Sequence, residues 1–317
     1  MLVCTRNRPE TLSNCLESIS KIVCPPGVQL TVVVGDNNDR PQKHAISSQA
    51  EKLGLNFAYV YEPRRGYCYI RNALLKAAEL LRHEILIFID DDELPDPGLV
   101  SAYLDCFSLY DADVVHGSYA GSTRRYPEGQ KARKVATYNV AFRRRLIAPA
   151  SEGGLALRFD TRLNLTGRED LEFFRDAACL GARMIYSERP LTYRKRLPSA
   201  PYAETYALAR NDVYVERVRR GSPAALYLFL KTYLRRGLLA AFLATTAILG
   251  KKTQGENDHS ASPLDANVAL FCGGLDGLLF GGVDRPAAKN GDIIPIAVGA
   301  GTETTSHGEE GIGAVSL

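Results

Sequence analysis

Apolar runs and helix-like spacings alternate along the first part of the chain. Apolar runs at residues 1–4, 30–34, 57–61 and 85–89 predict four strands, and a polar segment at 42–53 can form a surface helix. Two further helices are predicted by apolar side chains at helical spacing: Leu12, Leu16, Ile19 and Val23, and then Ile70, Ala73, Leu74, Ala77, Ala78 and Leu81. Strands that are apolar on both faces and alternate with helices predict a mostly parallel α/β sheet flanked by helices.

Polar side chains stand at the carboxyl ends of these strands. Right-handed crossovers between neighbouring strands predict the strand order 3-2-1-4, with the direction of winding reversed between the first and fourth strands. Ligands bind at such a switch point, outside the carboxyl ends of the strands. The residues predicted to converge there are Thr5, Arg6 and Asn7, then Asp36, Arg64 and Arg65, and finally Asp90, Asp91 and Asp92.

The second part of the chain is less regular. The pattern predicts, in order, a helix at 99–110, a strand at 114–115, a basic loop at 122–134, a strand at 137–144, and helices at 169–181 and 202–220. From residue 251 onward the sequence is rich in Gly, Ser, Thr and Asn, which predicts a poorly ordered tail over 251–317.

A strongly apolar segment with basic interruptions lies at 226–249. The uninterrupted stretch at 237–249 is shorter than the span of about 20 residues that a transmembrane helix needs. Two interpretations remain open: a helix lying in a membrane interface, with Arg235 and Arg236 near lipid phosphates, or a buried helix of the core.

Composition excludes little. The net charge of +3 does not decide whether the chain has a nucleic-acid partner, and seven dispersed cysteines are typical of reduced intracellular thiols. The chain starts in a strand-like segment with no signal peptide ahead of it, and a few residues of the first strand could be missing from it.

The carboxylates Asp90, Asp91 and Asp92 directly follow the apolar run at 85–89. Three adjacent like charges repel, and a hard divalent cation such as Mg²⁺ or Mn²⁺ would offset that repulsion. The alternative is a solvated strand end. The predicted switch point strengthens the metal interpretation but leaves both interpretations open.

Six segments in order carry a family resemblance: "VCTRNRPETLSNCLESI", "VVVGDNND", "EPRRGYCYIRNALLKAA", "ILIFIDDDELPDPGLV", "YNVAFRR" and "LTGREDLEFFRDAACLGARMIYSERPLTYRKR". They resemble a family-2 glycosyltransferase of the GT-A (Rossmann-like) fold, most like bacterial enzymes that build succinoglycan-type exopolysaccharides. The resemblance covers residues 1–220, which divide into a nucleotide-binding half (1–97) and an acceptor-binding half (98–220). A helical segment at 221–250 and the tail at 251–317 would follow.

The resemblance implies a donor site. The family's aspartate-any-aspartate motif falls on Asp90 and Asp92, which would hold the metal and, with Asp91, contact the donor. Two strand ends, Thr5 with Arg6 and then Asp36, match positions around the nucleotide base, although Gly35 replaces an acidic residue of the family pattern. Arg71 and Asn72 match the family's "ARN", in which Ile70 here replaces Ala. Without the resemblance, Arg71 would be taken for a solvated helix arginine.

Glu169 and Asp170 match the family's "GGED", with Arg168 replacing the second glycine. The resemblance implies that Asp170 is the general base, with Glu169 beside it. A carboxylate in a first helical turn is otherwise only a favourable partner of the helix dipole. The basic run Arg194-Lys195-Arg196 could clamp phosphate or could be a solvated or membrane-facing loop.

The implied function is inverting transfer from a UDP-sugar to a lipid-linked oligosaccharide or polysaccharide, at the cytoplasmic face of the membrane, with no nucleic-acid partner. One rival is a sugar-phosphate nucleotidyltransferase, which should carry a glycine-rich loop after the first strand, whereas "CTRNRPETL" has no glycine. A second rival is a non-catalytic, membrane-associated scaffold, which would not bind UDP with Mn²⁺.

The interfacial interpretation of 226–249 predicts that the chain sediments with anionic vesicles at low salt, where attraction to the surface is strongest. Truncation after residue 222 should release it. A full-length chain that stays in the supernatant under these conditions would contradict the prediction.

Overall fold

The computed structural model describes residues 1–122, 126–165, 167–194 and 201–234, together with Leu238, Leu278 and Ile296–Val298. The chain divides into two compact units. The first comprises Met1–Asp160, Asp170–Lys195 and Pro286–Leu317, and the second comprises Thr161–Glu169 and Arg196–Arg285.

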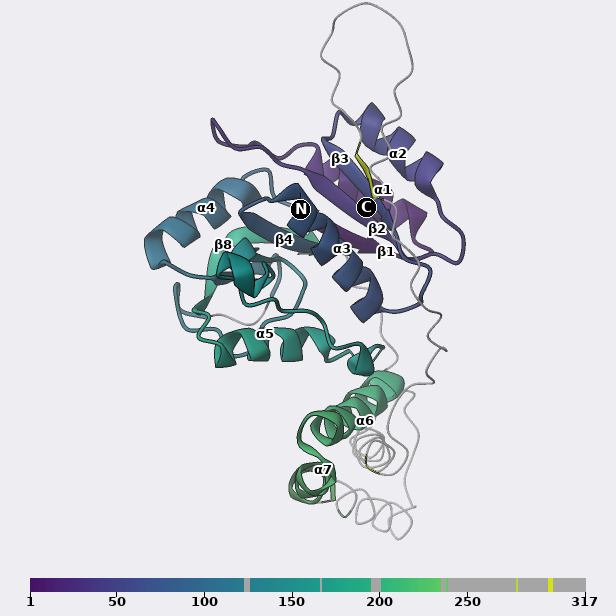
Figure 1. Ribbon diagram of the computed structural model, residues 1–317, viewed down its shortest axis with the longest axis vertical. Helices are drawn as coiled ribbons and strands as arrows, with labels where there is room; N and C mark the ends of the chain where they lie inside the picture. Colours follow the sequence, from purple (N-terminus) through teal and green to yellow (C-terminus); the bar gives the residue numbers. More distant parts are fainter. Residues whose placement is uncertain are drawn as a thin grey trace, which may run out of the picture. The chain divides into compact units, whose positions relative to one another are not determined.

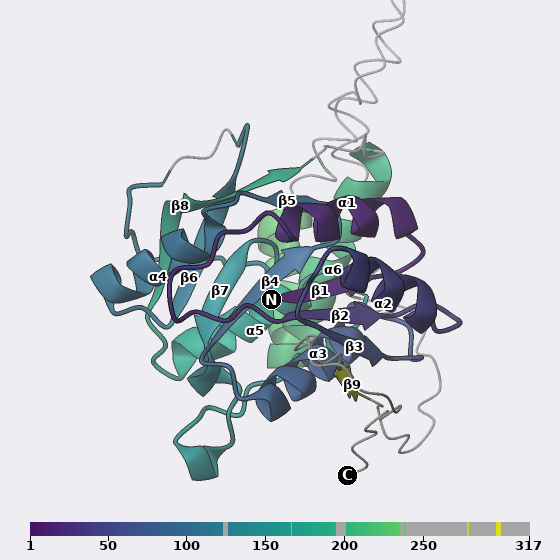
Figure 2. The same cartoon turned by 90° about the horizontal axis from the view of Figure 1, so that it is seen from above.

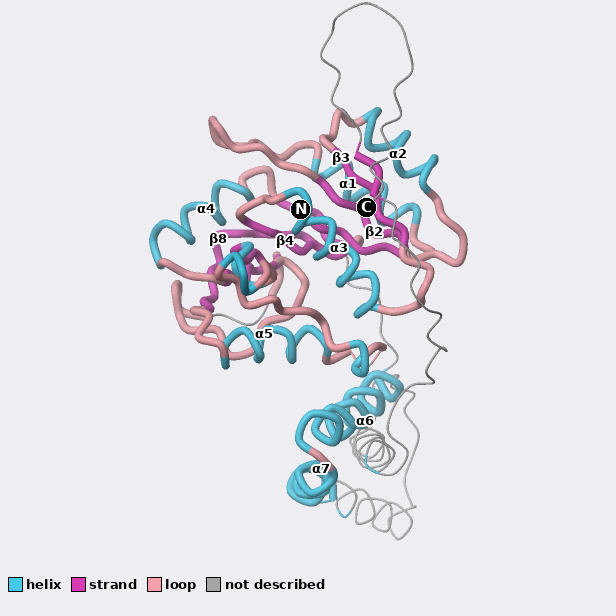
Figure 3. Tube along the Cα trace, in the orientation of Figure 1, coloured by secondary structure: helices cyan, strands magenta, loops and turns pink. Residues whose placement is uncertain are grey.

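The first unit is built on one sheet, whose strands lie at its centre (Figures 1 and 3). Its strands are β1 (Leu2–Thr5), β2 (Val32–Asp36), β3 (Phe57–Tyr61), β4 (Ile85–Asp90), β5 (Glu93–Pro95), β6 (Val114–Tyr119), β7 (Val140–Arg143), β8 (Met184–Arg194) and β9 (Ile296–Val298). Its helices are α1 (Pro9–Ile19), α2 (Lys43–Lys52), α3 (Tyr67–Leu81), α4 (Leu99–Tyr110) and α5 (Glu169–Cys179).

The sheet confirms the predicted switch point. Among the described residues the strand order is β5-β8-β6-β7-β4-β1-β2-β3-β9. Strands β3, β2, β1 and β4 are parallel neighbours, as the order 3-2-1-4 requires. Beyond them, β7 runs antiparallel between β4 and β6, whereas β6 and β8 are parallel. The carboxyl ends of β1, β4, β6 and β8 therefore lie at one edge of the sheet.

Two apolar layers cover the sheet, and Figure 2 shows the helices that form them. On one face, Leu74 of α3 and Phe174 of α5 belong to the same buried cluster as Phe88 of β4. On the other face, Leu16 of α1 and Tyr103 of α4 belong to a second buried cluster. The alternation of strands and helices along the sequence produces this three-layered α/β arrangement.

Several predicted boundaries moved. The helix predicted to include Val23 ends at Ile19, and Val23 itself is 68% exposed. The run predicted at 30–34 forms β2 at Val32–Asp36, and the strand predicted at 137–144 is reduced to Val140–Arg143. The first helix does not reach Val23 because the chain turns after Ile19, ahead of Pro25 and Pro26.

Three strands were not predicted. Strand β5 has three residues, and β8 is polar, contains Pro190 and has a register shift against β6 between His116 and Ser118. Strand β9 lies within the predicted tail and pairs antiparallel with β3. Apart from β9 and Leu278, the predicted tail at 251–317 lies outside the described residues.

The second unit contains α6 (Pro201–Arg220), α7 (Ser222–Leu228) and a π-helical turn at Phe229–Leu234. Its core includes Val213, Ala225 and Phe229. The helix predicted at 202–220 is confirmed. No helix in the described part of the chain combines the length and the apolar character needed to cross a membrane. Of the apolar segment predicted at 226–249, the structure describes only residues 226–234 and Leu238.

Candidate active site

The three carboxylates that follow β4 have different surroundings. Asp90 ends the strand and is partly exposed, whereas Asp91 is buried. The two oxygens of Asp91 accept hydrogen bonds from Thr5 Oγ1 at 2.9 Å and from Arg8 Nη1 at 3.2 Å. Burial raises the pKa of Asp91, and these two donors oppose that shift. Asp91 therefore joins the end of β4 to the loop between β1 and α1.

Asp92 has one paired and one unpaired oxygen. Its Oδ2 atom lies 3.0 Å from Arg194 Nη2, which also lies 3.7 Å from Asp90 Oδ2. Its Oδ1 atom is buried and has no hydrogen-bond partner among the residues that the structure describes. Lys195 and Arg196, the other members of the predicted basic run, lie outside the described residues.

Glu93 is a fourth carboxylate in this turn, and it is fully buried. Its Oε2 accepts from the backbone N–H groups of Asp90 at 2.9 Å and Asn139 at 3.1 Å, and its Oε1 accepts from Thr192 Oγ1 at 2.8 Å. Burial, followed by the charge of Asp90, raises the pKa of Glu93 to about 8. The sequence analysis missed this residue, although its position directly after three aspartates could have drawn attention to it.

Arg71 and Asn72 lie in the second turn of α3, Tyr67–Leu81, and have different surroundings. Arg71 is 8% exposed, and its guanidinium lies 5.3 Å from the ring centre of Tyr67 and 5.6 Å from that of Phe159. The charge of Arg71 opposes the effect of burial, which raises the pKa of Asp90. Arg71 therefore lies beside the acidic turn, as we call residues Asp90–Glu93. The amide of Asn72 donates to Phe159 O and accepts from Phe159 N, so Asn72 holds the 159 loop against α3.

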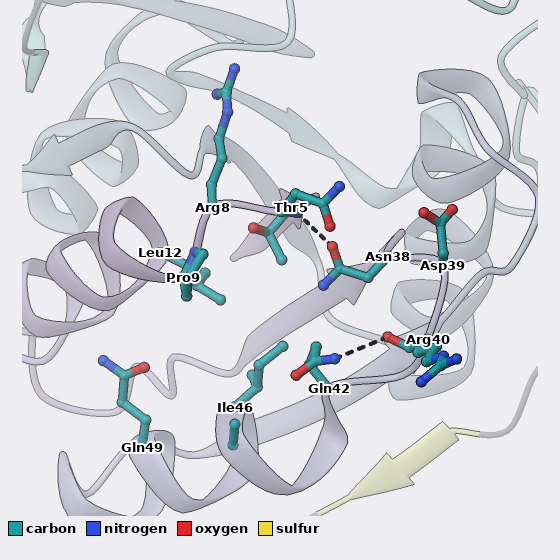
Figure 4. A pocket seen from close by; sticks show the side chains of 12 residues that line it. Thr5, Arg8, Pro9, Leu12, Asn38, Asp39, Arg40, Gln42, Ile46 and Gln49 are labelled. Carbon is teal, nitrogen blue, oxygen red and sulfur yellow. Dashed lines mark hydrogen bonds between the residues drawn. The ribbon is translucent and has the colours of Figure 1, made fainter.

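A cavity of about 400 Å³ lies beside the loop after β1, and Figure 4 shows the side chains that line it. It is shared by the loop after β1, helix α1, the loop after β2 and helix α2. Its lining residues are Thr5, Asn7, Arg8, Pro9, Leu12, Asn38, Asp39, Arg40, Gln42, Ala45, Ile46 and Gln49. Thr5 and Arg8 line this cavity and also donate hydrogen bonds to Asp91, so the cavity is separated from Asp91 by these two side chains.

Asp36 does not line this cavity, but it holds the loop after β2, which forms one of its walls. It is fully buried, and it accepts hydrogen bonds from the N–H groups of Asn38 at 2.9 Å and Gln42 at 2.6 Å and from the Tyr59 hydroxyl at 2.6 Å. The structure thus places Asp36 as the anchor of the loop that forms one wall.

Arg6, also predicted to contact the nucleotide, lies along the same loop. It donates to the carbonyl oxygen of Asn37 and, at 2.8 Å, to Asp39 Oδ1. Its side chain therefore ties the loop after β1 to the loop after β2, and it is absent from the residues that line the cavity.

Gly35 and Ile70, which both depart from the family pattern, pack directly against each other. A Cβ atom on Gly35 would lie 2.8 Å from Ile70 Cδ1 and 2.9 Å from Ile70 Cγ1. The larger Ile70 fills the space that a side chain at position 35 would need. The exchange is a packing adjustment between β2 and α3, and Asp36 keeps its place.

Asp170 lies at the start of α5. Its Oδ1 accepts from Leu171 N at 2.7 Å, and its Oδ2 lies 3.4 Å from Thr137 N. Thr137 stands two residues before Asn139, which is bonded to Glu93. These links place Asp170 at the sheet edge that carries the acidic turn. Glu169 is 3% exposed and therefore buried.

A second cavity, of about 320 Å³, is lined by the second half of β6, by Tyr186–Glu188 of β8 and by the loop between β6 and β7. Its walls include the stacked rings of Tyr126 and Tyr186, whose centres are 4.1 Å apart, and its rim carries Lys131, Arg133 and Lys134. Tyr138, next to Thr137, also lines it. From the sequence, Tyr126 and the basic residues were assigned to a loop and Tyr138 to a strand, whereas β8 with Tyr186 was not predicted.

His116 forms part of the floor of the second cavity. Its ring lies edge-on to Tyr138 and to Tyr186, with ring centres 5.0 Å and 5.6 Å away. Burial lowers the pKa of His116 to about 4, so the imidazole is neutral near pH 7. The five histidines are scattered along the sequence, so nothing in the sequence had singled out His116.

The acidic turn suits a magnesium or manganese ion. The described residues contain no group of three or more His, Cys, Asp or Glu side chains able to enclose a metal. Mg²⁺, however, is commonly held by one or two carboxylates, waters and substrate phosphates. The buried, unpaired Oδ1 of Asp92 and the partly exposed Asp90 provide such a pair.

Comparison with known proteins identifies the family. The model of Glycosyl transferase family 2 matches residues 1–205. This chain belongs to that family.

Individual relatives are more distant. The succinoglycan biosynthesis protein ExoM of Rhizobium meliloti (strain 1021) is 27% identical over 202 residues, which are 58% of this chain and 62% of ExoM. The match therefore spans less than two thirds of that relative.

Solved structures share the fold. The mannosyltransferase PcManGT from Pyrobaculum calidifontis, in complex with GDP-Man and Mn²⁺, superposes with a TM-score of 0.55 at 18% identity, over 88% of this chain and 86% of that chain. S. aureus TarS 1-349 in complex with UDP-GlcNAc gives a TM-score of 0.49 at 20% identity, over 68% and 65%. The first of these supports a GT-A-like fold, in agreement with the sequence analysis.

We predict that Asp92→Asn abolishes Mn²⁺-stimulated UDP binding, because the substitution weakens a metal ligand and removes no apolar contact. Calorimetry with and without Mn²⁺ measures the loss, and thermal unfolding should show an unchanged midpoint. Asp105→Asn on the exposed side of α4 removes the same charge away from the site and should bind normally. Near-normal Mn²⁺-dependent binding by folded Asp92→Asn would refute the metal assignment.

Proposed function

We propose that this protein transfers a sugar from a UDP-sugar to a hydroxyl of a lipid-linked oligosaccharide or growing polysaccharide, with inversion at the anomeric carbon. The observation that carries the proposal is the position of the acidic turn. It adjoins a nucleotide-sized cavity through Thr5 and Arg8, and it is linked through Glu93, Asn139 and the nearby Thr137 to Asp170.

The donor nucleoside would occupy the 400 Å³ cavity. Thr5 is the sequence-predicted contact that lines it, and Asp36 and Arg6 would act indirectly by fixing the loop at its wall. Arg71 is held by two aromatic rings beside Asp90, so its charge can face the diphosphate with little loss of side-chain entropy. Asn72 would contribute by holding the 159 loop.

Asp90 and Asp92 would hold Mg²⁺ or Mn²⁺, with Asp91 fixing the turn between them through Thr5 and Arg8. When bound, the ion stabilises the negative charge that develops on the diphosphate leaving group. Arg71 adds a fixed positive charge beside the same group.

The acceptor hydroxyl is a poor nucleophile near neutral pH, and a carboxylate must take its proton as it attacks. Asp170 is the proposed base because it lies at the same edge of the sheet and its bond to Thr137 N is long enough, at 3.4 Å, to be exchanged for a substrate. The attack forms the bond from the acceptor oxygen to the anomeric carbon and breaks the bond to the UDP oxygen in one displacement.

The acceptor would lie in the second cavity. Tyr126 is 37% exposed, and the face that it does not use against Tyr186 could stack on a sugar ring. The basic rim favours a negatively charged acceptor such as a lipid diphosphate. The relationship to a succinoglycan biosynthesis protein supports a role in exopolysaccharide synthesis. Peripheral contact with the inner face of the membrane, through the segment at 226–249, would bring such an acceptor within reach.

Asp170→Asn should leave UDP affinity nearly unchanged and lower the transfer rate at saturating UDP-sugar by about 10²-fold, the scale of losing a general base. Glu169→Gln is the matched control and should cost less, because adjacent helical residues point about 100° apart. Calorimetry gives the affinity, and UDP release gives the rate. If Glu169→Gln is the inactive variant, then Glu169 is the base. An Asp170→Asn variant with normal transfer would remove it from the mechanism.

Tyr126→Ala should raise the concentration of bacterial lipid extract needed for half-maximal UDP release by about threefold to tenfold, the scale of one lost aromatic contact. Tyr126→Phe retains the ring that stacks on Tyr186 and should behave like the wild type. The affinity for UDP should not change in either variant. An unchanged acceptor dependence in Tyr126→Ala would place the acceptor elsewhere.

A further inference from the structure

Arg194 occupies the position where a metal ion would be expected. It is the last residue of β8, and its backbone is paired with Glu93 of β5. Its guanidinium Nη2 lies 3.0 Å from Asp92 Oδ2 and 3.7 Å from Asp90 Oδ2, the same two carboxylates that match the family's metal motif. The side chain is 38% exposed, whereas that of Asp92 is only 10% exposed.

Arg8, the other cation in direct contact with the turn, is placed differently. It lies 3.2 Å from Asp91 Oδ1 and 3.9 Å from Asp92 Oδ2, and it makes no ion pair with Asp90 within 4 Å among the described contacts. Asp91 is also bonded to Thr5, which makes the Arg8 contact part of the framework of the turn. Arg194 alone pairs with both Asp90 and Asp92 in the described part of the chain.

A divalent ion and the Arg194 guanidinium cannot both bind Asp90 and Asp92 in this arrangement. Both cations would lie against Asp90 Oδ2 and the carboxylate of Asp92, and the double charge of the ion would repel the guanidinium at such short range. When a metal binds, the guanidinium has to move away. Its backbone is fixed by the ladder to β5, so the movement is a rotation of the side chain, which keeps the charge within reach of the same turn.

We propose that Arg194 is a substitute cation, which holds Asp90 and Asp92 together in the empty protein and passes to the diphosphate of the donor when the metal binds. The proposal rests on the proposed function, because it takes the metal and the nucleoside diphosphate as ligands of this turn. It adds a positioning role for Arg194, in which metal and nucleotide bind cooperatively. The metal alone must displace the guanidinium without compensation, whereas with UDP present the displaced guanidinium gains a new anion.

Two affinities of the full-length chain test the exchange. In Arg194→Gln, Mn²⁺ alone should bind about threefold to fivefold more tightly than in the wild type, because the competing cation is gone. At saturating Mn²⁺, UDP should bind about threefold to fivefold more weakly, because no guanidinium is released to its phosphates. Electron paramagnetic resonance of free Mn²⁺ measures the first affinity and calorimetry the second.

The matched control is Arg189→Gln, in the same strand, where the guanidinium lies 3.7 Å from Glu128 and away from the acidic turn. Both of its affinities should equal those of the wild type. A substitution that merely loosened the fold would weaken both ligands, so opposite changes in the two affinities distinguish the exchange from a structural role.

Weaker Mn²⁺ binding in Arg194→Gln would overturn the proposal, and so would an unchanged affinity for either ligand. If the wild-type chain binds neither Mn²⁺ nor UDP, the proposed function itself fails. If the wild type binds both and Arg194→Gln binds them equally well, only the exchange fails.

Discussion

The buried carboxylate of Glu93 holds together the strands on which the site is built. It bonds the backbone of Asp90 at the end of β4, the backbone of Asn139 just before β7 and the hydroxyl of Thr192 in β8. Burying a carboxyl group is costly unless its oxygens are hydrogen-bonded, and here each oxygen accepts from a donor. This one side chain therefore connects the acidic turn with two other parts of the fold: the segment from Thr137 to Asn139, and the strand that ends in Arg194.

Around that anchor, the carboxylates have separate functions because their surroundings differ. Asp91 is used by Thr5 and Arg8 and fixes the turn, whereas Asp92 keeps one oxygen unpaired. Asp90 lies between the charges of Arg71 and Arg194, which oppose the effect of burial on its pKa. A run of identical residues in the sequence thus becomes a set of distinct chemical positions.

The same logic separates contact from support among the matched motif residues. Asp36 and Asn72 stand at positions that the family resemblance associates with the nucleotide, yet their polar atoms are bonded to neighbouring backbone and to Tyr59. Gly35 and Ile70 depart from the family pattern as a pair, because the isoleucine fills the space beside the glycine. A motif match therefore indicates a place in the fold, and the hydrogen bonds indicate how the residue acts there.

The sequence alone determined the alternation of strands and helices, the order 3-2-1-4 and the convergence of Thr5 and the aspartates. All of these follow from local periodicity and from the handedness of crossovers. The sequence alone did not reveal β8, the role of Glu93, the second cavity or the pairing of Arg194 with Asp92. Those features join residues up to about a hundred positions apart, such as Thr192 with Glu93. A polar strand with a register shift has no clear local signature, because its partners are chosen by hydrogen bonds that form only when the sheet is assembled.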